Sequence, residues 1–291
     1  MKKHILAVLG AGSLWGTMGF FSRSLAAIGI GPSGAIFVRC AVAAVCFALT
    51  IALTDPKAFR IRPRDFWCFI GSGICSLLFF TYCYFTAISL LSLSTAAILL
   101  YTAPTFVVLL SAVLFHEKLN ARKLAALALA FLGCCLVSGL GGGSLPLKGL
   151  LYGLGAGFGY ALYSVFARLA IDRGYGSNTV NLYSCLLAAI GSGLLWGVSA
   201  PLSAMCASWA NVGLCVLAGL VTCYLPYLLY TFGLTGLEAG RASILASVEP
   251  VVATLLGVLV YRESMSVLSA LGVLCVLGAV VLLNRKEKEK A

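Results

Sequence analysis

The sequence predicts an all-α membrane protein of ten transmembrane helices, built as two five-helix halves that enter the membrane from opposite sides. Three observations predict this fold: the composition, a series of ten apolar segments and an internal repeat. Of the 291 residues, 61% are hydrophobic and only 10% are charged, whereas a soluble domain typically carries about 25% charged residues. No stretch of the chain is left for a sizeable soluble domain, so the function must lie in the membrane part.

Ten apolar segments are long enough to cross a bilayer. A helix of about 20 apolar residues spans about 30 Å of hydrocarbon, because backbone groups in lipid must be paired within the segment. Short connections rich in glycine and proline separate these segments. The first segment follows Lys2, Lys3 and His4 as in a signal peptide, but we interpret it as a membrane helix because no secreted domain follows it. The segments are predicted at residues 5–25, 33–53, 66–90, 94–115, 124–140, 149–170, 179–198, 212–233, 242–261 and 267–284.

The distribution of lysine and arginine predicts the orientation. With the N-terminus in the cytoplasm, sixteen of the 20 Lys and Arg residues lie on the cytoplasmic side, Arg39 lies within the membrane, and three lie outside. This asymmetry is the positive-inside pattern of membrane proteins, and ten crossings return the C-terminus to the cytoplasm. The net charge of +11 is therefore a topology signal, and nucleic acid is not an expected partner. We expect a multi-pass protein of the cytoplasmic (inner) membrane.

The sequence contains an internal repeat with an offset of about 146 residues. Residues 95–117 (TAAILLYTAPTFVVLLSAVLFHE) match residues 241–263 (RASILASVEPVVATLLGVLVYRE). One residue closer, 15–23 (WGTMGFFSR) match 160–168 (YALYSVFAR). Pairs separated by 146 positions are Pro104 and Pro250, Glu117 and Glu263, and Tyr84 and Tyr230.

The repeat divides the chain into two halves, residues 1–143 and 144–291, with five predicted helices each. Since five is odd, the second half enters the membrane from the opposite side, which makes an inverted-topology repeat. Glu117 is then at the cytoplasmic end of its helix, and Glu263 is at the external end of its own. Two such halves can exchange conformations around a site between them, closing one face while the other opens.

No arrangement of reactive residues in the sequence indicates an enzyme. The 12 cysteines are scattered through apolar segments, and His4 and His116 are the only histidines. We therefore expect no catalytic residues, no metal site and no cofactor. A polytopic membrane enzyme and a channel are the alternatives from other functional classes.

Three local motifs accompany the ten predicted helices in two halves. They are Trp15-Gly16, Pro104 with Glu117, and Glu249-Pro250 with Glu263. With these features the chain resembles, over essentially its whole length, the EamA branch of the drug/metabolite transporter (DMT) superfamily. The resemblance implies a basket-like bundle in which helices one to four and six to nine line a central cavity, with the fifth and tenth set apart.

Members of this branch mostly export amino acids and related metabolites. The resemblance thus implies a secondary transporter that exports such a solute across the cytoplasmic membrane. Multidrug efflux and nucleotide-sugar carriage are alternatives within the superfamily. The expected partners are the solute, the lipid bilayer and, as a candidate coupling ion, the proton; the protein is expected to be a monomer or a homodimer.

Two ionisable residues lie clearly inside the hydrocarbon in this prediction, where charge is costly and usually functional. Glu249 is about 12 Å deep from the cytoplasmic end of its helix, and Arg39 is about 9 Å deep from the outside, at about 1.5 Å per residue. Glu249 either binds a substrate ammonium group or a proton, or it is a structural residue, neutral or paired with Arg39. Arg39 either holds a substrate carboxylate, neutralises Glu249, or anchors its helix at the outer interface.

Pro104 and Pro250 each remove a backbone hydrogen bond in mid-helix, and such a break in lipid requires neighbours or a cavity to pair the freed carbonyls. Because the two are related by the repeat, they are predicted to flank the central site; a kink that serves packing alone is the alternative. Eight aromatic residues are candidates for the substrate pathway; packing and an aromatic belt at the membrane interface are the alternatives. They are Trp15, Tyr84, Tyr101, Tyr160, Tyr163, Tyr224, Tyr227 and Tyr230.

Overall fold

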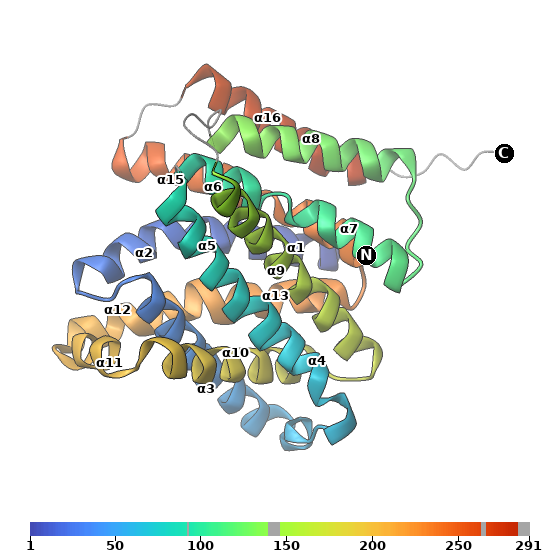
Figure 1. Ribbon diagram of the computed structural model, residues 1–291. Helices are drawn as coiled ribbons and strands as arrows, with labels where there is room; N and C mark the ends of the chain where they lie inside the picture. The colour runs from blue at the N-terminus through green and yellow to red at the C-terminus, as the bar shows by residue number, and fades with distance from the viewer. Residues whose placement is uncertain (92, 139–145, 263–265, 285–291) are drawn as a thin grey trace.

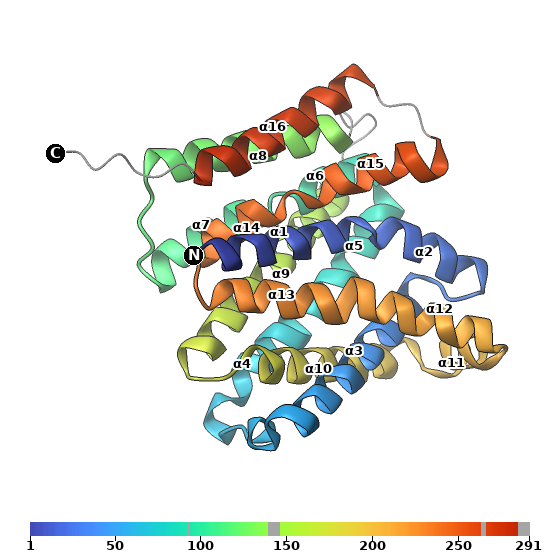
Figure 2. The same ribbon diagram turned by 180° about the vertical axis from the view of Figure 1, so that it is seen from behind.

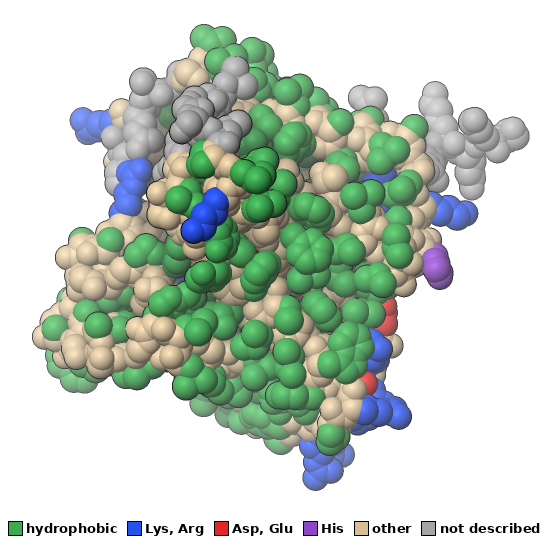
Figure 3. Space-filling model, in the orientation of Figure 1, with side chains coloured by type: hydrophobic (Ala, Val, Ile, Leu, Met, Phe, Trp, Pro, Cys, Tyr) green, Lys and Arg blue, Asp and Glu red, His purple; other side chains and the backbone are tan. Residues whose placement is uncertain are grey.

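Figure 1 shows the computed structural model of the protein, which describes residues 1–91, 93–138, 146–262 and 266–284. The regular structure in these ranges is helical throughout, without strands. Hydrophobic side chains cover most of the face seen in Figure 3, and charged side chains gather mainly near its lower right edge. A broad apolar face of this kind suits contact with lipid rather than with water.

The helices follow one another in the order predicted from the sequence. The first half contains α1 (Lys2–Gly16), α2 (Met18–Ala27), α3 (Pro32–Thr54), α4 (Phe66–Ile70), α5 (Phe79–Leu90), α6 (Leu93–Leu100), α7 (Ala103–Leu114) and α8 (Ala121–Ser138). The second half contains α9 (Leu147–Asp172), α10 (Ser177–Trp196), α11 (Ser199–Cys206), α12 (Trp209–Gly219), α13 (Leu225–Leu234), α14 (Ala239–Ala246), α15 (Glu249–Tyr261) and α16 (Val267–Asn284). Short helical segments complete the order: η1 (Pro56–Phe59), η2 (Pro63–Asp65), η3 (Gly71–Leu78) and η4 (Leu220–Tyr224).

Each predicted segment coincides with helix to within a few residues, except that 139–140 lie outside the described residues. The prediction missed α11, which occupies a connection expected to be irregular. In the described ranges, eight helical stretches are long and apolar enough to cross a membrane. The other two segments of the predicted ten correspond to α8 and to α16, whose apolar part, Val267–Leu283, is shorter. The multi-pass, all-helical fold is thus confirmed, while the count of ten stays a prediction.

The helices α8 and α16 lie side by side, apart from the rest of the bundle (Figures 1 and 2). Their contact is close at Gly133, where an added Cβ would lie 2.8 Å from the carbonyl oxygen of Gly272. Glycine allows two helix backbones to approach in this way. These are the fifth and tenth predicted helices, which the family resemblance expects outside the central basket.

The fourth and ninth membrane helices are each interrupted at the same place in the repeat. The fourth is divided into α6 and α7, and the ninth into α14 and α15, with two turn residues in between. The two breaks are 146 residues apart in the sequence, which is the offset of the repeat. Pro104 and Pro250 occupy the second position of the helices that follow the breaks. In the first turn of a helix the backbone N–H has no partner within the helix, so proline, which lacks this group, loses no hydrogen bond there. The prolines therefore start new helices instead of kinking continuous ones.

The third and eighth membrane helices share a second irregularity. Each contains a π-helical segment, η3 or η4, and residues 74–78 of the first correspond to 220–224 of the second at the offset of 146. A π segment inserts extra backbone into the helical turn and is frequent at functional sites. The repeat is therefore visible in the irregularities of the backbone as well as in the sequence.

The N-terminus and the end of α16 lie at the same end of the bundle. The Arg241 guanidinium donates to the carbonyl oxygen of Leu283 at 3.0 Å and also contacts the sulfur of Met1 at 4.0 Å. An even number of membrane crossings requires this arrangement. The cytoplasmic location of that end remains a prediction from the basic residues.

Candidate functional site

The two broken helices are each covered by a glycine-bearing helix of the other half. A Cβ on Gly12 in α1 would lie 2.8 Å from the carbonyl oxygen of Ala246, the last residue of α14. A Cβ on Gly157 in α9 would lie 2.9 Å from the carbonyl oxygen of Leu99 in α6. Only glycine permits such close backbone approach. These contacts place α1 and α9 against the two breaks, on either side of the molecular centre.

A narrow cavity is lined by helices of both halves. Most of its lining residues are buried, and they leave room for about one water molecule. In this conformation the cavity is too small for an organic solute. Its lining comes from α1, η3, α5, α9 and α13, with the residues Trp15, Ser76, Leu77, Phe80, Tyr160, Tyr163, Ser164, Tyr227 and Tyr230.

Aromatic rings form most of the cavity wall and stand at large angles to one another. The Trp15 ring lies 5.2 Å from that of Tyr227, at 72°, and 5.3 Å from that of Tyr230, at 53°. The Tyr163 and Tyr227 rings are 4.7 Å apart at 66°, and Tyr160 lies 6.3 Å from Trp15. Such a box offers apolar area together with ring faces that attract cations.

The hydroxyl groups around the cavity are largely paired with one another. Ser164 Oγ and the Tyr230 hydroxyl lie 2.7 Å apart. The Tyr163 hydroxyl donates to Asn181 Oδ1, and the Asn181 amide donates to Thr231 Oγ1 at 2.8 Å. Asn181 is fully buried in α10. This network fixes the orientation of two cavity tyrosines by tying α9 to α10 and α13.

Glu249 is the first residue of α15 and borders the aromatic cavity through Tyr160. It is half-buried, and the Tyr160 hydroxyl donates to its Oε2 at 3.4 Å, which is long for a hydrogen bond. Glu249 therefore stands at the helix break next to Tyr160, and among the described residues its carboxyl group has this one long hydrogen bond.

Arg39 is held by the eighth membrane helix. Its Nε donates to Thr222 Oγ1 at 2.6 Å, and a terminal nitrogen donates to the Thr222 carbonyl oxygen at 2.8 Å. Thr222 lies in η4. No ion pair within the described residues joins Arg39 to Glu249. The structure thus shows a contact of Arg39 with the eighth membrane helix that was not among its predicted roles, which stay predictions.

The other predicted site residues divide into two groups. Trp15, Tyr160, Tyr163, Tyr227 and Tyr230 line the cavity. The remaining aromatic candidates lie outside that lining. Tyr224 does not line the cavity with Tyr227 and Tyr230. Its hydroxyl lies 2.8 Å from Thr50 Oγ1 and its ring packs on Phe47, both in α3.

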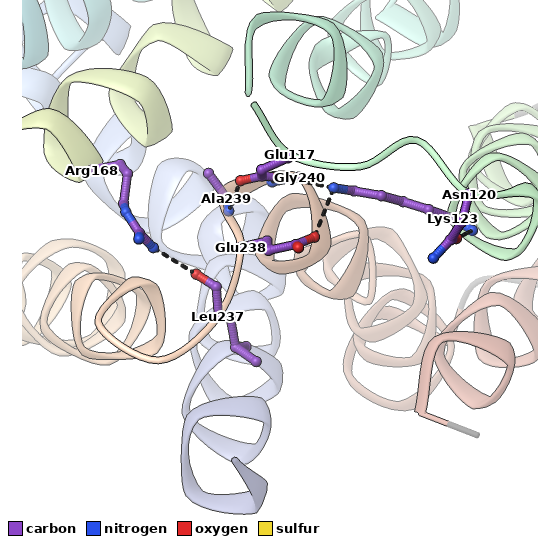
Figure 4. Close-up of polar contacts among 8 residues, drawn as sticks. All are labelled: Glu117, Asn120, Lys123, Arg168, Leu237, Glu238, Ala239 and Gly240. Atoms are coloured by element: carbon purple, nitrogen blue, oxygen red, sulfur yellow. Dashed lines mark hydrogen bonds and ion pairs between the residues drawn. The ribbon is translucent and has the colours of Figure 1, made fainter. Parts of the chain in front are cut away.

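A second polar cluster joins the two halves at the end of the bundle near the N-terminus (Figure 4). Glu117, beyond the end of α7, accepts hydrogen bonds from the backbone N–H of Ala239 at 2.7 Å and of Gly240 at 3.3 Å. Lys123 of α8 lies between Glu117 at 2.6 Å and Glu238 at 2.9 Å. The side chains of Glu117 and Lys123 are 7% and 5% exposed. We call this group the Glu117 junction.

The Glu117 junction uses the start of a helix as its anion site. The first N–H groups of α14 have no partner within the helix, so a carboxylate placed there pairs them and interacts favourably with the helix dipole. Close by, Arg168 Nη1 donates to the carbonyl oxygens of Leu234 and Leu237 at 3.1 Å each. The connection between α13 and α14 is therefore fixed by α7, α8 and α9 together. Glu263, the repeat counterpart of Glu117, lies outside the described residues.

Sequence reasoning missed the polar residues in and behind the cavity wall. Ser76 and Ser164 in the wall and Asn181 behind it are isolated in apolar segments, so neither periodicity nor charge identifies them. A signal was available for Ser76, because the repeat offset aligns it with Thr222. Lys123 is a single basic residue of a predicted connection, and the sequence does not indicate that it pairs with Glu117, six residues before it.

Comparison with known proteins identifies what this architecture resembles. A family model described as the EamA-like transporter family matches residues 2–139 and again residues 147–285. A protein of Archaeoglobus fulgidus named as an uncharacterized transporter is 28% identical over 214 residues, which cover 70% of this chain and 71% of that protein.

Two proteins of Bacillus subtilis are also similar and are likewise named as uncharacterized transporters. YxxF is 25% identical over 96% of this chain and 88% of its own length, and YojE is 30% identical over 74% of this chain and 68% of its own. A solved crystal structure matches 98% of this chain and 97% of its own, with a TM-score of 0.83 at 20% identity. At that identity the likeness shows a shared fold.

Proposed function

Because the chain belongs to the EamA-like transporter family and is thus a membrane transporter rather than an enzyme, we propose that it exports an amino acid or a related metabolite by alternating access. The inverted-topology arrangement of its two halves, the cytoplasmic location of both ends and the inner membrane belong to the same proposal. The observation that carries it is the closed aromatic cavity, which both halves line beside two helix breaks.

The cavity suits an amphipathic metabolite better than a bare ion. Its rings provide apolar area and cation-binding faces, while Glu249 lies behind Tyr160. Broken membrane helices end near the centre of many secondary transporters, where their free backbone groups and nearby charges bind substrate. In our proposal Glu249 binds the amino group of the solute or a proton, and Arg39 is the candidate partner for a carboxylate.

Alternating access requires that the closed cavity open toward one side at a time. Opening toward the end that carries the Glu117 junction would separate α7 and α8 from the start of α14. The hydrogen bonds and ion pairs of Glu117 and Lys123 then stabilise the conformation closed on that side. This makes the Glu117 junction the proposed cytoplasmic lock of the transport cycle.

The test begins with the substrate. Metabolites retained and released by cells with and without the protein are compared, and each solute whose release depends on the protein is then tested in proteoliposomes. A carrier shows saturable counterflow of labelled solute against unlabelled solute. A channel shows flux without counterflow, and an enzyme consumes the solute; either result would contradict the proposal.

Glu249→Gln separates the roles of that residue. If Glu249 exchanges protons during the cycle, wild-type counterflow changes with pH while that of the variant does not. Asp172→Asn is the control, because Asp172 is an exposed partner of Arg168 on the surface. Unchanged transport and unchanged pH dependence in Glu249→Gln would assign Glu249 a structural role.

A further inference from the structure

Among the residues that line the cavity, Ser76 has a hydroxyl that is both fully buried and without a hydrogen bond. Its Oγ has no hydrogen-bond partner among the described residues. The residue is 1% exposed and lines the aromatic cavity. A buried hydroxyl without a partner destabilises a protein, unless another molecule supplies the partner.

The repeat shows what the equivalent position does when its partner is present. Thr222 is 146 residues after Ser76 and lies at the corresponding place in the π-helical segment η4. Its Oγ1 accepts a hydrogen bond from Arg39 at 2.6 Å. The second half therefore uses this hydroxyl to hold a cation of the protein itself. In the first half the same position faces the cavity with its acceptor free.

The surroundings of Ser76 define the charge of a matching ligand. The lining consists of aromatic, aliphatic and serine side chains, and no Lys, Arg or His belongs to it. Aromatic faces attract cations and repel anions. The carboxyl group of Glu249, which contacts the cavity residue Tyr160, adds to this preference. A positively charged group is therefore the better guest for this part of the cavity.

The hydroxyl adds a second requirement. Ser76 Oγ offers lone pairs, so a cation that bears an N–H can donate to it, whereas a quaternary ammonium cannot. The Ser164, Tyr163 and Tyr230 hydroxyls are already engaged in the network described above, which leaves the Ser76 hydroxyl open to a ligand.

We propose that Ser76 accepts a hydrogen bond from a primary or secondary ammonium group of the transported solute, and that the solute is therefore a protonated organic amine. The inference rests on the proposed transport function and adds a substrate class and a specificity-determining residue to it. The ammonium group lies among the faces of the cavity rings and against Ser76, while the rest of the solute occupies space that the rings vacate when the cavity opens.

The experiment measures counterflow in proteoliposomes with two probes that differ only at nitrogen, 2-phenylethylammonium and its N,N,N-trimethyl derivative. In the wild type we expect the primary ammonium to be exchanged with the lower half-saturation concentration. Ser76→Ala should raise the half-saturation concentration of the primary ammonium about 10- to 100-fold, the range for a hydrogen bond to a charged group. It should leave the half-saturation concentration of the trimethyl probe unchanged. For Ser76→Cys, whose side chain is similar in size but a weak acceptor, we expect a value for the primary ammonium between those of the wild type and Ser76→Ala.

Ser111→Ala is the matched control. Ser111 Oγ is likewise buried without a partner among the described residues, but it lies in α7 and outside the cavity lining. We expect it to exchange both probes like the wild type. Gel-filtration profiles and thermal unfolding of the Ser76 variants show whether they are folded.

Two results would overturn the inference. One is equal exchange of the primary ammonium by Ser76→Ala, Ser111→Ala and the wild type. The other is a wild-type protein that shows counterflow with a solute found in the release screen but not with the primary ammonium. Both leave the proposed function intact, because counterflow still occurs. Failure of the proposed function is a different result, namely the absence of counterflow with every solute from the screen.

Discussion

Glu117→Gln tests the Glu117 junction with the smallest change in shape. The substitution keeps one amide oxygen for the N–H of Ala239 but removes the negative charge. It also turns an NH₂ group toward Gly240 N or Lys123 Nζ, both of which are donors. The hydrogen bonds lost are thus the charge-assisted ones, while the packing of the junction is preserved.

The magnitude follows from the burial of the pair. Hydrogen bonds to charged groups contribute about 1.5–3 kcal/mol, and removing one partner of a buried ion pair costs about 3–5 kcal/mol when the other charge is left alone. Lys123 is not left alone, because Glu238 remains 2.9 Å away and is 53% exposed to solvent. We therefore expect Glu117→Gln to lower the free energy of unfolding by about 1.5–3 kcal/mol.

The assay is reversible unfolding of the purified protein by SDS in mixed micelles. A double-mutant cycle with Lys123→Met isolates the pair, since the effect of Glu117→Gln should shrink by at least half once Lys123 is gone. Asp172→Asn is the control: its exposed i,i+4 pair with Arg168 should contribute about 0.5 kcal/mol or less. If Glu117→Gln and Asp172→Asn had equal effects, the junction would not be a stabilising lock.

Three further predictions follow from the site. Gly12→Val should destabilise the protein by about 1–3 kcal/mol in the same assay, because its Cβ would lie 2.8 Å from the carbonyl oxygen of Ala246. Gly19→Val is the control: nothing lies within 4 Å of the added Cβ, so we expect less than half of that destabilisation. Tyr163→Phe should cost about 1–3 kcal/mol because it removes the donor to the buried Asn181 Oδ1, and a neutral result would show that the network does not position the cavity wall. Glu249→Gln should abolish the pH dependence of counterflow, as measured in proteoliposomes.

The membrane helices were predictable from the sequence because length and apolar composition are enough to identify them. That the fourth and ninth membrane helices are interrupted was predictable from the sequence, but the position of the breaks, at residues 101–102 and 247–248, was not. Pro104 and Pro250 indicate an interruption, yet proline is favoured near the start of a helix. The preceding helices therefore end at Leu100 and Ala246, four residues before each proline.

The candidate site was predictable in part for a similar reason. Large aromatic residues stand out in the sequence, and five of the eight predicted aromatic residues line the cavity. Which face of a π-containing helix they occupy was not predictable, because a π segment shifts the angular positions of all residues after it. Tyr224 belongs to η4 itself and faces α3, whereas Tyr227 and Tyr230 follow it and face the cavity.

Contacts across long sequence separations explain what remained unseen. The repeat indicates Glu117 as a landmark, but its backbone partners Ala239 and Gly240 are more than 120 residues away. The same is true of Arg39, whose partner Thr222 is 183 residues away. A single sequence gives the residue types for such pairs and not their proximity, because the packing of the whole bundle decides it.

The packing also limits how the transporter can move. The closest helix pairs each join one half to the other: α8 packs on α16, α3 on α10, α5 on α9, and α1 on α13. A motion that separated residues 1–143 from 144–291 as rigid bodies would break all of these contacts at once, including the backbone approach at Gly12 and Gly157. Moving groups that each contain helices from both halves would keep most of them intact. The bodies that rock during alternating access are therefore expected to be mixed bundles, and the Glu117 junction, which is small and polar, is the kind of contact that can break and re-form between them.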